Sequence, residues 1–400
     1  MVLENFPFSP YCCQHARLSR NLYKYLLDHA GCGRNVLISP FCAEITLLAL
    51  YTGADDRKNA DIEKLLGVDA MAMAERISTE LRQLKLDEDK NCQPNNPEGK
   101  DENFRLYLAC AVLLPPNAPA HQPYADKFSK ILNPEILPMI FSENIDRLTE
   151  FIQQHTLESV RDVVFPATPP GNAVAVNALH FRSNWHRPFG LHRTFKMEFT
   201  AADGFRREVD TLHGKLKCPC WIPDDMGGAK FLEVPFEDDW WKAIFVLPGK
   251  KRCPCFGKRF RTLSELTDLL TPEKLTTISQ QLRYHTVQEV TVQIPKFRIA
   301  KQVQLETVLS ELGVRMPLNE LSKPLRVTSF LQKISFSLDE RGVGDALPIK
   351  PERKILENMD YFPPYKAEFI ANRPFAFFVR HYLNGQILYI GHVTDPAVLM

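Results

Sequence analysis

Apolar residues in the first third of the chain recur at the spacing of helices. One face collects Leu18, Leu22, Tyr25 and Leu26. This period of about 3.6 residues predicts an amphipathic helix. The dipeptide Ser39-Pro40 predicts the start of a second helix, because a hydroxyl caps free backbone N–H groups and proline fits the first helical position. Residues 142–156 repeat the helical pattern and predict another helix.

After about residue 174 the pattern changes to short apolar runs between turn residues, which predicts strands. The runs cover residues 173–181, 230–235, 242–248, 287–299, 375–381 and 386–393. Helices first and strands later are typical of an α+β fold rather than a doubly wound α/β fold. No repeat or flexible linker divides the 400 residues, so we expect one domain over residues 1–400, although length alone suggests two or three.

Charge and composition change the picture by excluding some classes of function. The chain has 49 basic and 48 acidic residues, so we expect no charge-driven binding to nucleic acid or to a membrane. No apolar run approaches the ~18 residues of a membrane-spanning helix. The N-terminus lacks a signal-peptide pattern, Asn-X-Ser/Thr is absent, and the ten cysteines suit a reducing compartment. We therefore expect a cytoplasmic protein, with unconventional release from the cell as the alternative.

Six segments, in chain order, resemble the serpin family. They are NVLISPF at 35–41, NALHFRSNW at 177–185, VQIPKF at 292–297, DERG at 339–342, NRPFAFF at 372–378 and GQILYIGHV at 385–393. Each motif alone is moderately specific, whereas all six in the same order are very specific. The resemblance implies an α+β fold of three β-sheets and about nine helices. It also implies an exposed reactive-centre loop, here with its flanks at 340–372.

The resemblance implies a protease inhibitor rather than an enzyme. In inhibitory members a serine-type endopeptidase cleaves the loop and is held as an acyl-enzyme, while the cut loop inserts as a new strand into the main sheet. A trypsin-like or chymotrypsin-like protease is therefore the expected partner of a monomer without cofactor or metal. The chain has no nucleophile elbow, phosphate loop or His-Glu-X-X-His motif that would favour an enzyme.

The loop hinge departs from the family's run of small residues. By resemblance the hinge comprises Glu340, Gly342, Val343, Asp345 and Pro348. Side chains alternate in an inserted strand, so Asp345 would follow Val343 into the core. Burying an unpaired carboxylate costs several kcal/mol or forces it to bind a proton, and Pro348 and Pro351 each remove a ladder N–H.

These departures predict slow insertion, which would let a protease finish hydrolysis and leave. Two alternatives therefore stay open. One is a non-inhibitory serpin that acts as a binding, chaperone or carrier protein. The other is a protease substrate that competes reversibly without insertion.

Family spacing from Glu340 places the scissile bond at Leu356-Glu357. Leu356 would suit a chymotrypsin-like pocket. Arg353 and Lys354 are alternative bait residues for a trypsin-like protease.

The resemblance also implies a region beneath the main sheet where its strands part. The residues assigned to it are Ser39, Cys42, Asn177, Trp185 and Gln332. Inhibitory members usually carry histidine at the position of Gln332 and serine at that of Cys42. Glutamine can still donate and accept hydrogen bonds, so we expect a repacked network rather than a broken one.

Two local features have competing interpretations. Cys218-Pro219-Cys220 and Cys253-Pro254-Cys255 could supply four thiolates to zinc, but paired zinc cysteines are usually separated by two to four residues, so we expect no metal. Residues 250–261 carry six basic side chains that would suit a polyanion. A solvated loop balanced by nearby acids is the simpler interpretation.

Overall fold

The computed structural model contains two large sheets with helices packed around them. It describes residues 10–31, 33–51, 56–67, 69–70, 72–77, 79, 104–114, 139–142, 145–156, 160, 172–238, 240–253, 257–314, 318–322, 325–345 and 367–398. The α-helices with described bounds are α1 (Pro10–His29), α2 (Pro40–Tyr51), α3 (Asp56–Leu66), α6 (Ile145–His155), α7 (Leu263–Leu269), α8 (Pro272–Tyr284) and α9 (Leu305–Glu311).

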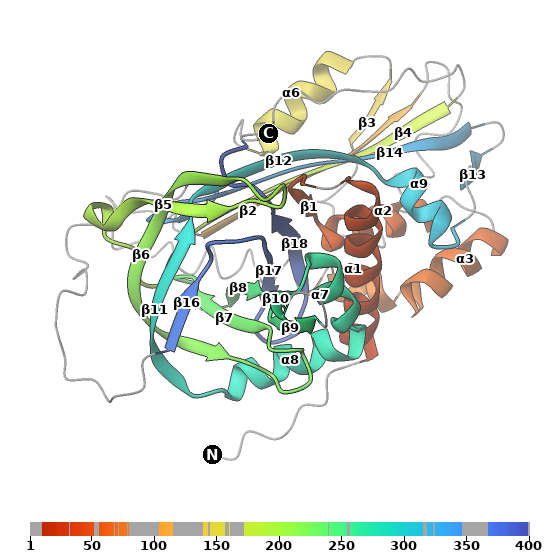
Figure 1. Ribbon diagram of the computed structural model, residues 1–400. Coiled ribbons are helices and arrows are strands. Elements are labelled where there is room, and N and C mark those ends of the chain that lie inside the picture. Colours follow the sequence, from red (N-terminus) through yellow and green to blue (C-terminus); the bar gives the residue numbers. More distant parts are fainter. Residues whose placement is uncertain are drawn as a thin grey trace, which may run out of the picture.

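The main sheet has seven strands in the order β12-β14-β15-β4-β2-β3, with β13 paired to β14. Their bounds are β12 (Phe297–Gln304), β14 (Leu325–Leu338), β15 (Gly342–Val343), β4 (Asn172–Asn184), β2 (Phe104–Leu114), β3 (Met139–Ser142) and β13 (Leu318–Ser322). Figure 1 shows this sheet as a long layer, with α6 over one face and α2 and the second sheet on the other.

The second sheet has nine strands in the order β1-β18-β17-β8-β7-β6-β11-β16, with β5 paired to β6. Their bounds are β1 (Val36–Ile38), β18 (Ile387–Val393), β17 (Phe375–His381), β8 (Trp241–Leu247), β7 (Lys230–Pro235), β6 (Arg206–Trp221), β11 (Val287–Pro295), β16 (Ala367–Ile370) and β5 (Thr194–Thr200). The long strand β6 pairs with β7 at one end and with β5 and β11 along its length, so it joins two groups of strands into one sheet. A separate hairpin consists of β9 (Lys250–Cys253) and β10 (Gly257–Phe260).

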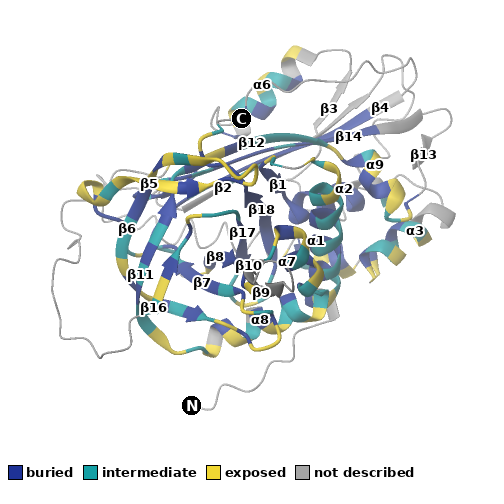
Figure 2. Ribbon diagram, viewed as in Figure 1, coloured by how far each residue is buried: buried dark blue, intermediate teal, exposed yellow. Residues whose placement is uncertain are grey.

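The core lies between the two sheets and around α2. Every residue of β8 and β18 is buried, and α2 is buried from Pro40 to Leu48 (Figure 2). Apart from Glu44 and Thr46, most side chains of α2 are apolar on every side of the helix, so no face of it can be exposed to water without loss. The N-cap expected at Ser39 is present, since its hydroxyl accepts the Cys42 N–H at 3.2 Å.

The apolar pattern predicted several elements, but it placed Ser142 in a helix although this residue ends β3, and it missed one division between strands. The expected strands 230–235 and 375–381 are β7 and β17, and the expected helix at 142–156 is α6. The run 287–299, predicted as one strand, is divided at Lys296 between β11 and β12, which belong to different sheets. In the parts of the chain that the structure describes, no helix has both the length and the apolar character needed to cross a bilayer.

A buried ion pair lies inside the second sheet. Arg380 on β17 is fully buried, and its Nη2 donates to Glu233 Oε2 on β7 at 2.8 Å, across the intervening strand β8. Removing one partner of such a pair leaves a charge buried without compensation, which costs about 3–5 kcal/mol. The pair therefore constrains which substitutions this sheet tolerates.

We predict that Arg380→Met lowers the free energy of unfolding by about 3–5 kcal/mol, and that adding Glu233→Leu recovers part of the loss. Arg206 and Glu198 provide the matched control, because they form a 3.1 Å pair with side chains 69% and 58% exposed. Arg206→Met should change stability by less than about 1 kcal/mol. Urea unfolding measures both effects, and equal losses would contradict the prediction.

Candidate functional site

The expected hinge begins in a tight turn between β14 and β15. The Asp339 carboxylate accepts the backbone N–H groups of Arg341 and Gly342 at 2.8 and 3.1 Å. The Arg341 guanidinium also donates to this carboxylate, at 2.9 and 3.2 Å. The Asp339 N–H in turn donates to the Gly342 carbonyl at 3.0 Å. The direction in which the loop leaves β14 is therefore fixed by one aspartate.

Glu340 anchors the first residue of the hinge to two other elements. The Thr194 hydroxyl donates to its Oε1 at 2.6 Å, and the Lys296 ammonium contacts both carboxylate oxygens at 3.0 Å. Burial alone would raise the pKa of Glu340, but these donors hold the pKa below its usual value. An ionised Glu340 therefore ties the turn to β5 and to the β11–β12 connection.

Trp185 covers the end of the main sheet beside this turn. Its indole N–H donates to the Asp339 carbonyl at 3.1 Å, and its backbone N–H donates to the Arg341 carbonyl at 2.8 Å. Its ring stacks on Phe236 at a centroid distance of 4.8 Å. Rigid aromatic packing thus supports the backbone from which the loop departs.

The first hinge residues already form a strand inside the main sheet. Gly342 and Val343, which make up β15, pair with Asn184 and Ser183 of β4, and Val343 also pairs with Leu338 of β14. Val343 is buried. The loop therefore starts between the two strands that an inserted segment would have to separate.

The chain turns out of the sheet at the next two residues. Gly344 has φ +67°, and a Cβ there would lie 1.9 Å from the Phe181 carbonyl oxygen, so only glycine fits. Asp345 has φ +58° and is exposed. The remaining expected loop residues lie outside the part of the chain that the structure describes, namely Pro348, Pro351, Arg353, Lys354, Leu356 and Glu357.

The register of β15 shows what insertion would demand of Asp345. Because Gly342 and Val343 face Asn184 and Ser183, continuing the strand places Asp345 opposite Phe181. The pairing of Val343 with Leu338 places it opposite Phe336 on the other side. Both phenylalanines are 1% exposed, so the residues that face the carboxylate on both neighbouring strands would be buried aromatic side chains.

Below the hinge, β14 and β4 pair directly in parallel, from Arg326 with Asn172 to Ser335 with His180. Gln332 of β14 is hydrogen-bonded beneath the sheet to Ser39, the N-cap residue of α2. Its side-chain oxygen accepts the Ser39 N–H at 2.8 Å, and its Nε2 donates to the Ser39 carbonyl at 2.9 Å. Gln332 thus satisfies both backbone groups of a fully buried residue.

Asn177 of β4 contacts a different part of α2. Its Nδ2 donates to the Cys42 carbonyl at 3.0 Å and to the Thr46 hydroxyl. Its buried Oδ1 has no hydrogen-bond partner among the described residues. Burial raises the pKa of the Cys42 thiol to about 12, so this sulfur stays protonated. Each of the two strands is therefore bonded to α2 separately.

Asp238 lies beneath the inserted hinge residues. Its carboxylate accepts the Ser183 hydroxyl at 3.1 Å and the backbone N–H groups of Trp240 and Trp241 at 2.8 and 2.7 Å. Burial raises the pKa of Asp238 to about 6 despite these donors. The site thus contains a carboxyl group whose charge changes in mildly acidic solution.

Sequence reasoning missed four residues of this site, which are Thr46, Thr194, Asp238 and Lys296. Only Lys296 carried a usable signal, because it lies inside the VQIPKF segment. The other three reach the site through contacts between distant segments. Trp185 lies beside the hinge turn, and Gln332, Asn177, Cys42 and Ser39 are hydrogen-bonded to one another or to α2 beneath the main sheet. Their role in opening the sheet stays a prediction.

The cysteine pairs and the basic stretch are described only in part. Cys218 and Cys220 are buried on β6, and burial raises the pKa of both thiols, that of Cys220 to about 11. Thiolates, the form that binds zinc, are therefore disfavoured at this pair.

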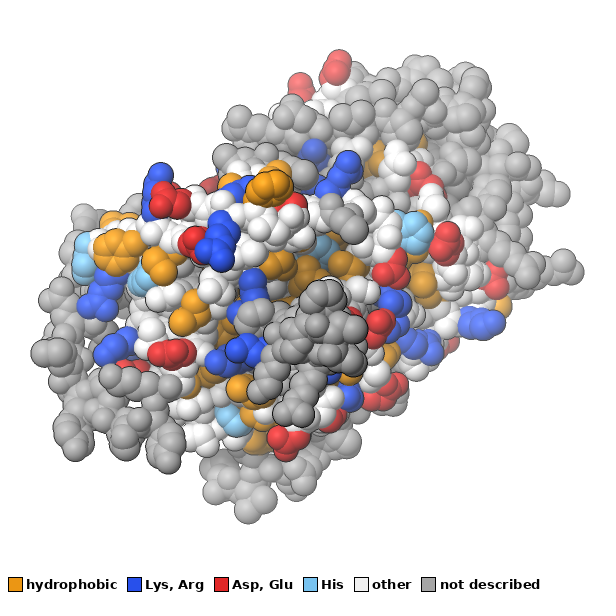
Figure 3. All heavy atoms as spheres, viewed as in Figure 1, with side chains coloured by type: hydrophobic (Ala, Val, Ile, Leu, Met, Phe, Trp, Pro, Cys, Tyr) orange, Lys and Arg blue, Asp and Glu red, His pale blue; other side chains and the backbone are white. Residues whose placement is uncertain are grey.

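Cys255 and the side chains of residues 251–260 lie outside the described part, so a polyanion site at Lys250–Arg261 stays a prediction. Lysine, arginine and acidic residues intermingle on the face shown in Figure 3.

We predict that Gln332→Leu destabilises the protein, because it leaves the Ser39 N–H buried and unpaired and removes one of two hydrogen bonds to the Ser39 carbonyl, which also accepts the Ala43 N–H at 3.2 Å. The unpaired N–H should cost about 1–3 kcal/mol. Gln332→His, with one donor and one acceptor, should lose less. Gln304→Leu, at an exposed position of β12, is the control. Thermal unfolding tests this, and a Gln332→Leu midpoint equal to that of the control would contradict it.

We predict that Asp238 makes stability depend on pH. Its folded pKa of about 6 lies above the ordinary aspartate value of 3.8 because the group is buried, so the folded protein binds this proton more tightly than the unfolded chain. The favourable contribution is therefore greatest below about pH 4 and falls as the pH rises to about 6. Asp238→Asn should remove this component and raise stability at neutral pH. Unfolding measured across this window tests it, and identical pH dependence in both proteins would exclude it.

Comparisons with known proteins agree with this geometry. The family model described as "Serpin (serine protease inhibitor)" matches residues 14–396. The chain is 23% identical to leukocyte elastase inhibitor of Bos taurus over 96% of this chain and 98% of that protein. It is 22% identical to neuroserpin of Mus musculus over 95% of this chain and 90% of that protein.

Solved structures share the fold at low sequence identity. The native state of the thermophilic serpin tengpin superposes with a TM-score of 0.77 at 19% identity, covering 96% of this chain and 94% of that one. Thyroxine-binding globulin in complex with thyroxine also gives a TM-score of 0.77, at 16% identity, over 97% and 99% of the two chains. Proteins of this family are generally protease inhibitors rather than enzymes. The chain belongs to the serpin family and has the α+β serpin fold.

Proposed function

We propose that this serpin inhibits a serine-type endopeptidase by inserting its cleaved loop into the main sheet, and that Asp345 slows the insertion. One observation carries the proposal. Gly342 and Val343 already occupy the position of a new strand, antiparallel to both β14 and β4. Loop insertion would extend this strand rather than start one.

The extended register supports insertion at some positions. Continuing β15 places Leu347 between Leu179 and Ile334, which are both fully buried. It replaces one parallel ladder between β14 and β4 with two antiparallel ladders. A completed insertion would be strongly favourable, because the sheet would gain a second ladder of hydrogen bonds. Antiparallel pairing is also slightly more stable per residue than parallel pairing.

The same register opposes insertion at its third residue. Asp345 must pass from solvent to a position between Phe181 and Phe336. Burial of its charge would cost several kcal/mol unless the carboxyl group first binds a proton. Because acyl-enzyme hydrolysis competes with insertion, a delay at this step releases active protease and leaves a cut inhibitor.

A non-inhibitory role as a binding or carrier protein is the second candidate. The unfavourable position of Asp345 favours it, and so does the likeness in fold to thyroxine-binding globulin, which was solved with thyroxine bound. In that case the loop would be cut without insertion. The two candidates therefore differ in what happens after cleavage.

The remaining details of the proposal follow the sequence analysis. The scissile bond is proposed at Leu356-Glu357, with Arg353 and Lys354 as alternative bait residues. The protein is proposed to act as a monomer in the cytoplasm. The similarity to leukocyte elastase inhibitor supports a serine protease as the partner, without identifying it.

We predict that Asp345→Asn increases trapping, because it removes the charge while asparagine still tolerates the left-handed conformation of the native hinge. A barrier lowered by about 2 kcal/mol would raise the ratio of trapping to release about 30-fold. The readout is the SDS-stable complex formed with trypsin-like and chymotrypsin-like proteases. Asp224→Ala, an exposed acid in the β6–β7 turn, is the control.

A second readout needs no target protease. Cleavage near Leu356 should raise the melting temperature of Asp345→Asn more than that of the unsubstituted protein, because a full strand joins the sheet. If the variant shows neither a stable complex nor a rise after cleavage, the inhibitor proposal is wrong. If the melting temperature rises after cleavage but no stable complex forms, the loop inserts and the proteases tested are not the targets.

A further inference from the structure

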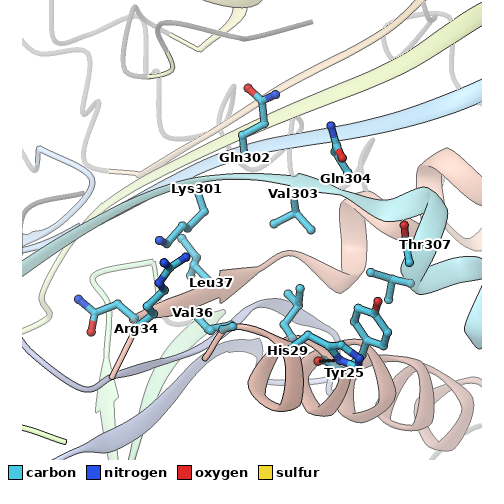
Figure 4. A pocket seen from close by; sticks show the side chains of 14 residues that line it. Tyr25, His29, Arg34, Val36, Leu37, Lys301, Gln302, Val303, Gln304 and Thr307 are labelled. Atoms are coloured by element: carbon cyan, nitrogen blue, oxygen red, sulfur yellow. Dashed lines mark hydrogen bonds between the residues drawn. The ribbon is translucent and has the colours of Figure 1, made fainter. Parts of the chain in front are cut away.

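A hollow of about 360 Å³ lies between α1, β1, β12 and α9, away from the hinge (Figure 4). Its volume falls in the range of small-molecule sites, about 300–1,000 Å³. Its lining residues are Tyr25, Leu26, His29, Ala30, Arg34, Asn35, Val36, Leu37, Lys301, Gln302, Val303, Gln304, Thr307 and Val308. All of them are described, and none is acidic.

Two cationic side chains lie at one end of this hollow. Figure 4 shows Arg34 and Lys301 side by side, at the opposite end from Tyr25 and His29. Burial and the nearby Arg34 guanidinium lower the pKa of Lys301. Each of the two charges therefore disfavours the other, and a bound anion would offset this repulsion.

The rest of the lining is apolar or aromatic. Val36 and Leu37 of β1 and Val308 of α9 are buried, and Val303 of β12 is partly buried. The rings of Tyr25 and His29 stack at 4.0 Å and close the far end. A ligand that matches this surface needs an apolar body attached to an anionic group.

We propose that this hollow binds a small amphipathic carboxylate, an organic acid with an aromatic or medium-chain aliphatic body. The Arg34 guanidinium can hold a carboxylate through two parallel hydrogen bonds, with Lys301 as the second charge. The apolar body would lie along Val36, Val303 and Val308. The proposal does not depend on protease trapping, because no residue of the hinge lines the hollow.

The simplest competing occupant is water. At about 30 Å³ per molecule, the volume corresponds to about a dozen waters. Water would satisfy both cations but would leave the valine-rich wall wetted. Displacing it with an apolar body that also supplies a carboxylate should therefore be favourable.

Isothermal titration calorimetry with the full chain tests the proposal. The probes are naphthalene-2-carboxylate and decanoate, and naphthalene-2-carboxamide is the neutral match of the first. We expect at least one carboxylate to bind and the carboxamide to bind at least about tenfold weaker, a difference of about 1.4 kcal/mol. Arg34→Gln and Lys301→Met should each weaken carboxylate binding by a similar factor. Thr307→Trp, at an exposed position of the lining, should weaken both carboxylates by obstructing the hollow.

Lys196→Gln is the matched control, because it removes one exposed cation from β5, which contributes nothing to the lining. It should leave binding unchanged. Equal binding of the carboxylate and the carboxamide would overturn the proposal, as would an equal effect of Lys196→Gln and Arg34→Gln. Absence of heat with both carboxylates would identify the hollow as water-filled only. The melting temperature of each variant shows whether a loss of binding is caused by unfolding. If Arg34→Gln or Lys301→Met unfolds, Thr307→Trp and the comparison of carboxylate with carboxamide still test the proposal.

Discussion

The parallel hydrogen-bonded contact between β14 and β4 is the constraint on which the rest of this structure depends. It closes the main sheet below the hinge, from Ser335 and His180 down to Arg326 and Asn172. Above it, the short strand β15 occupies the space between the same two strands. The native sheet is therefore incomplete, with a strand begun at one end and excluded from the remainder.

Helix α2 connects this contact to the core. Gln332 on one strand is bonded to the backbone of Ser39, and Asn177 on the other is bonded to the following turn of the helix. Because the strands contact different parts of α2, they cannot separate without disturbing at least one set of buried hydrogen bonds. Gln332 bonds to the backbone of Ser39, while the buried Oδ1 of Asn177 has no hydrogen-bond partner among the described residues.

Much of the fold was predictable because its signals are local. The period of apolar residues indicated α1, α6, β7 and β17, and the serpin-like segments identified the hinge turn. The division of residues 287–299 was not predictable, because the break at Lys296 depends on two sheets that are assembled from distant segments. Asp238 was missed for the same reason, since only tertiary contacts bring it beneath Ser183. The sequence predicts a cost for burying Asp345 on insertion, whereas the register of β15 is needed to name Phe181 and Phe336 as the residues that would face it.

Because β15 lies at one end of the β14–β4 ladder, the proposed insertion would separate these two strands one pair of residues at a time. The order in which the loop residues enter is then the order of the sequence. An unfavourable residue near the start of the loop would enter the sheet before many new hydrogen bonds have formed. An unfavourable residue later in the loop would enter after most of these bonds have formed. The rate of the proposed insertion would thus depend more on the first residues of the loop than on the later ones. An acidic residue later in the loop would leave the first steps of insertion unhindered.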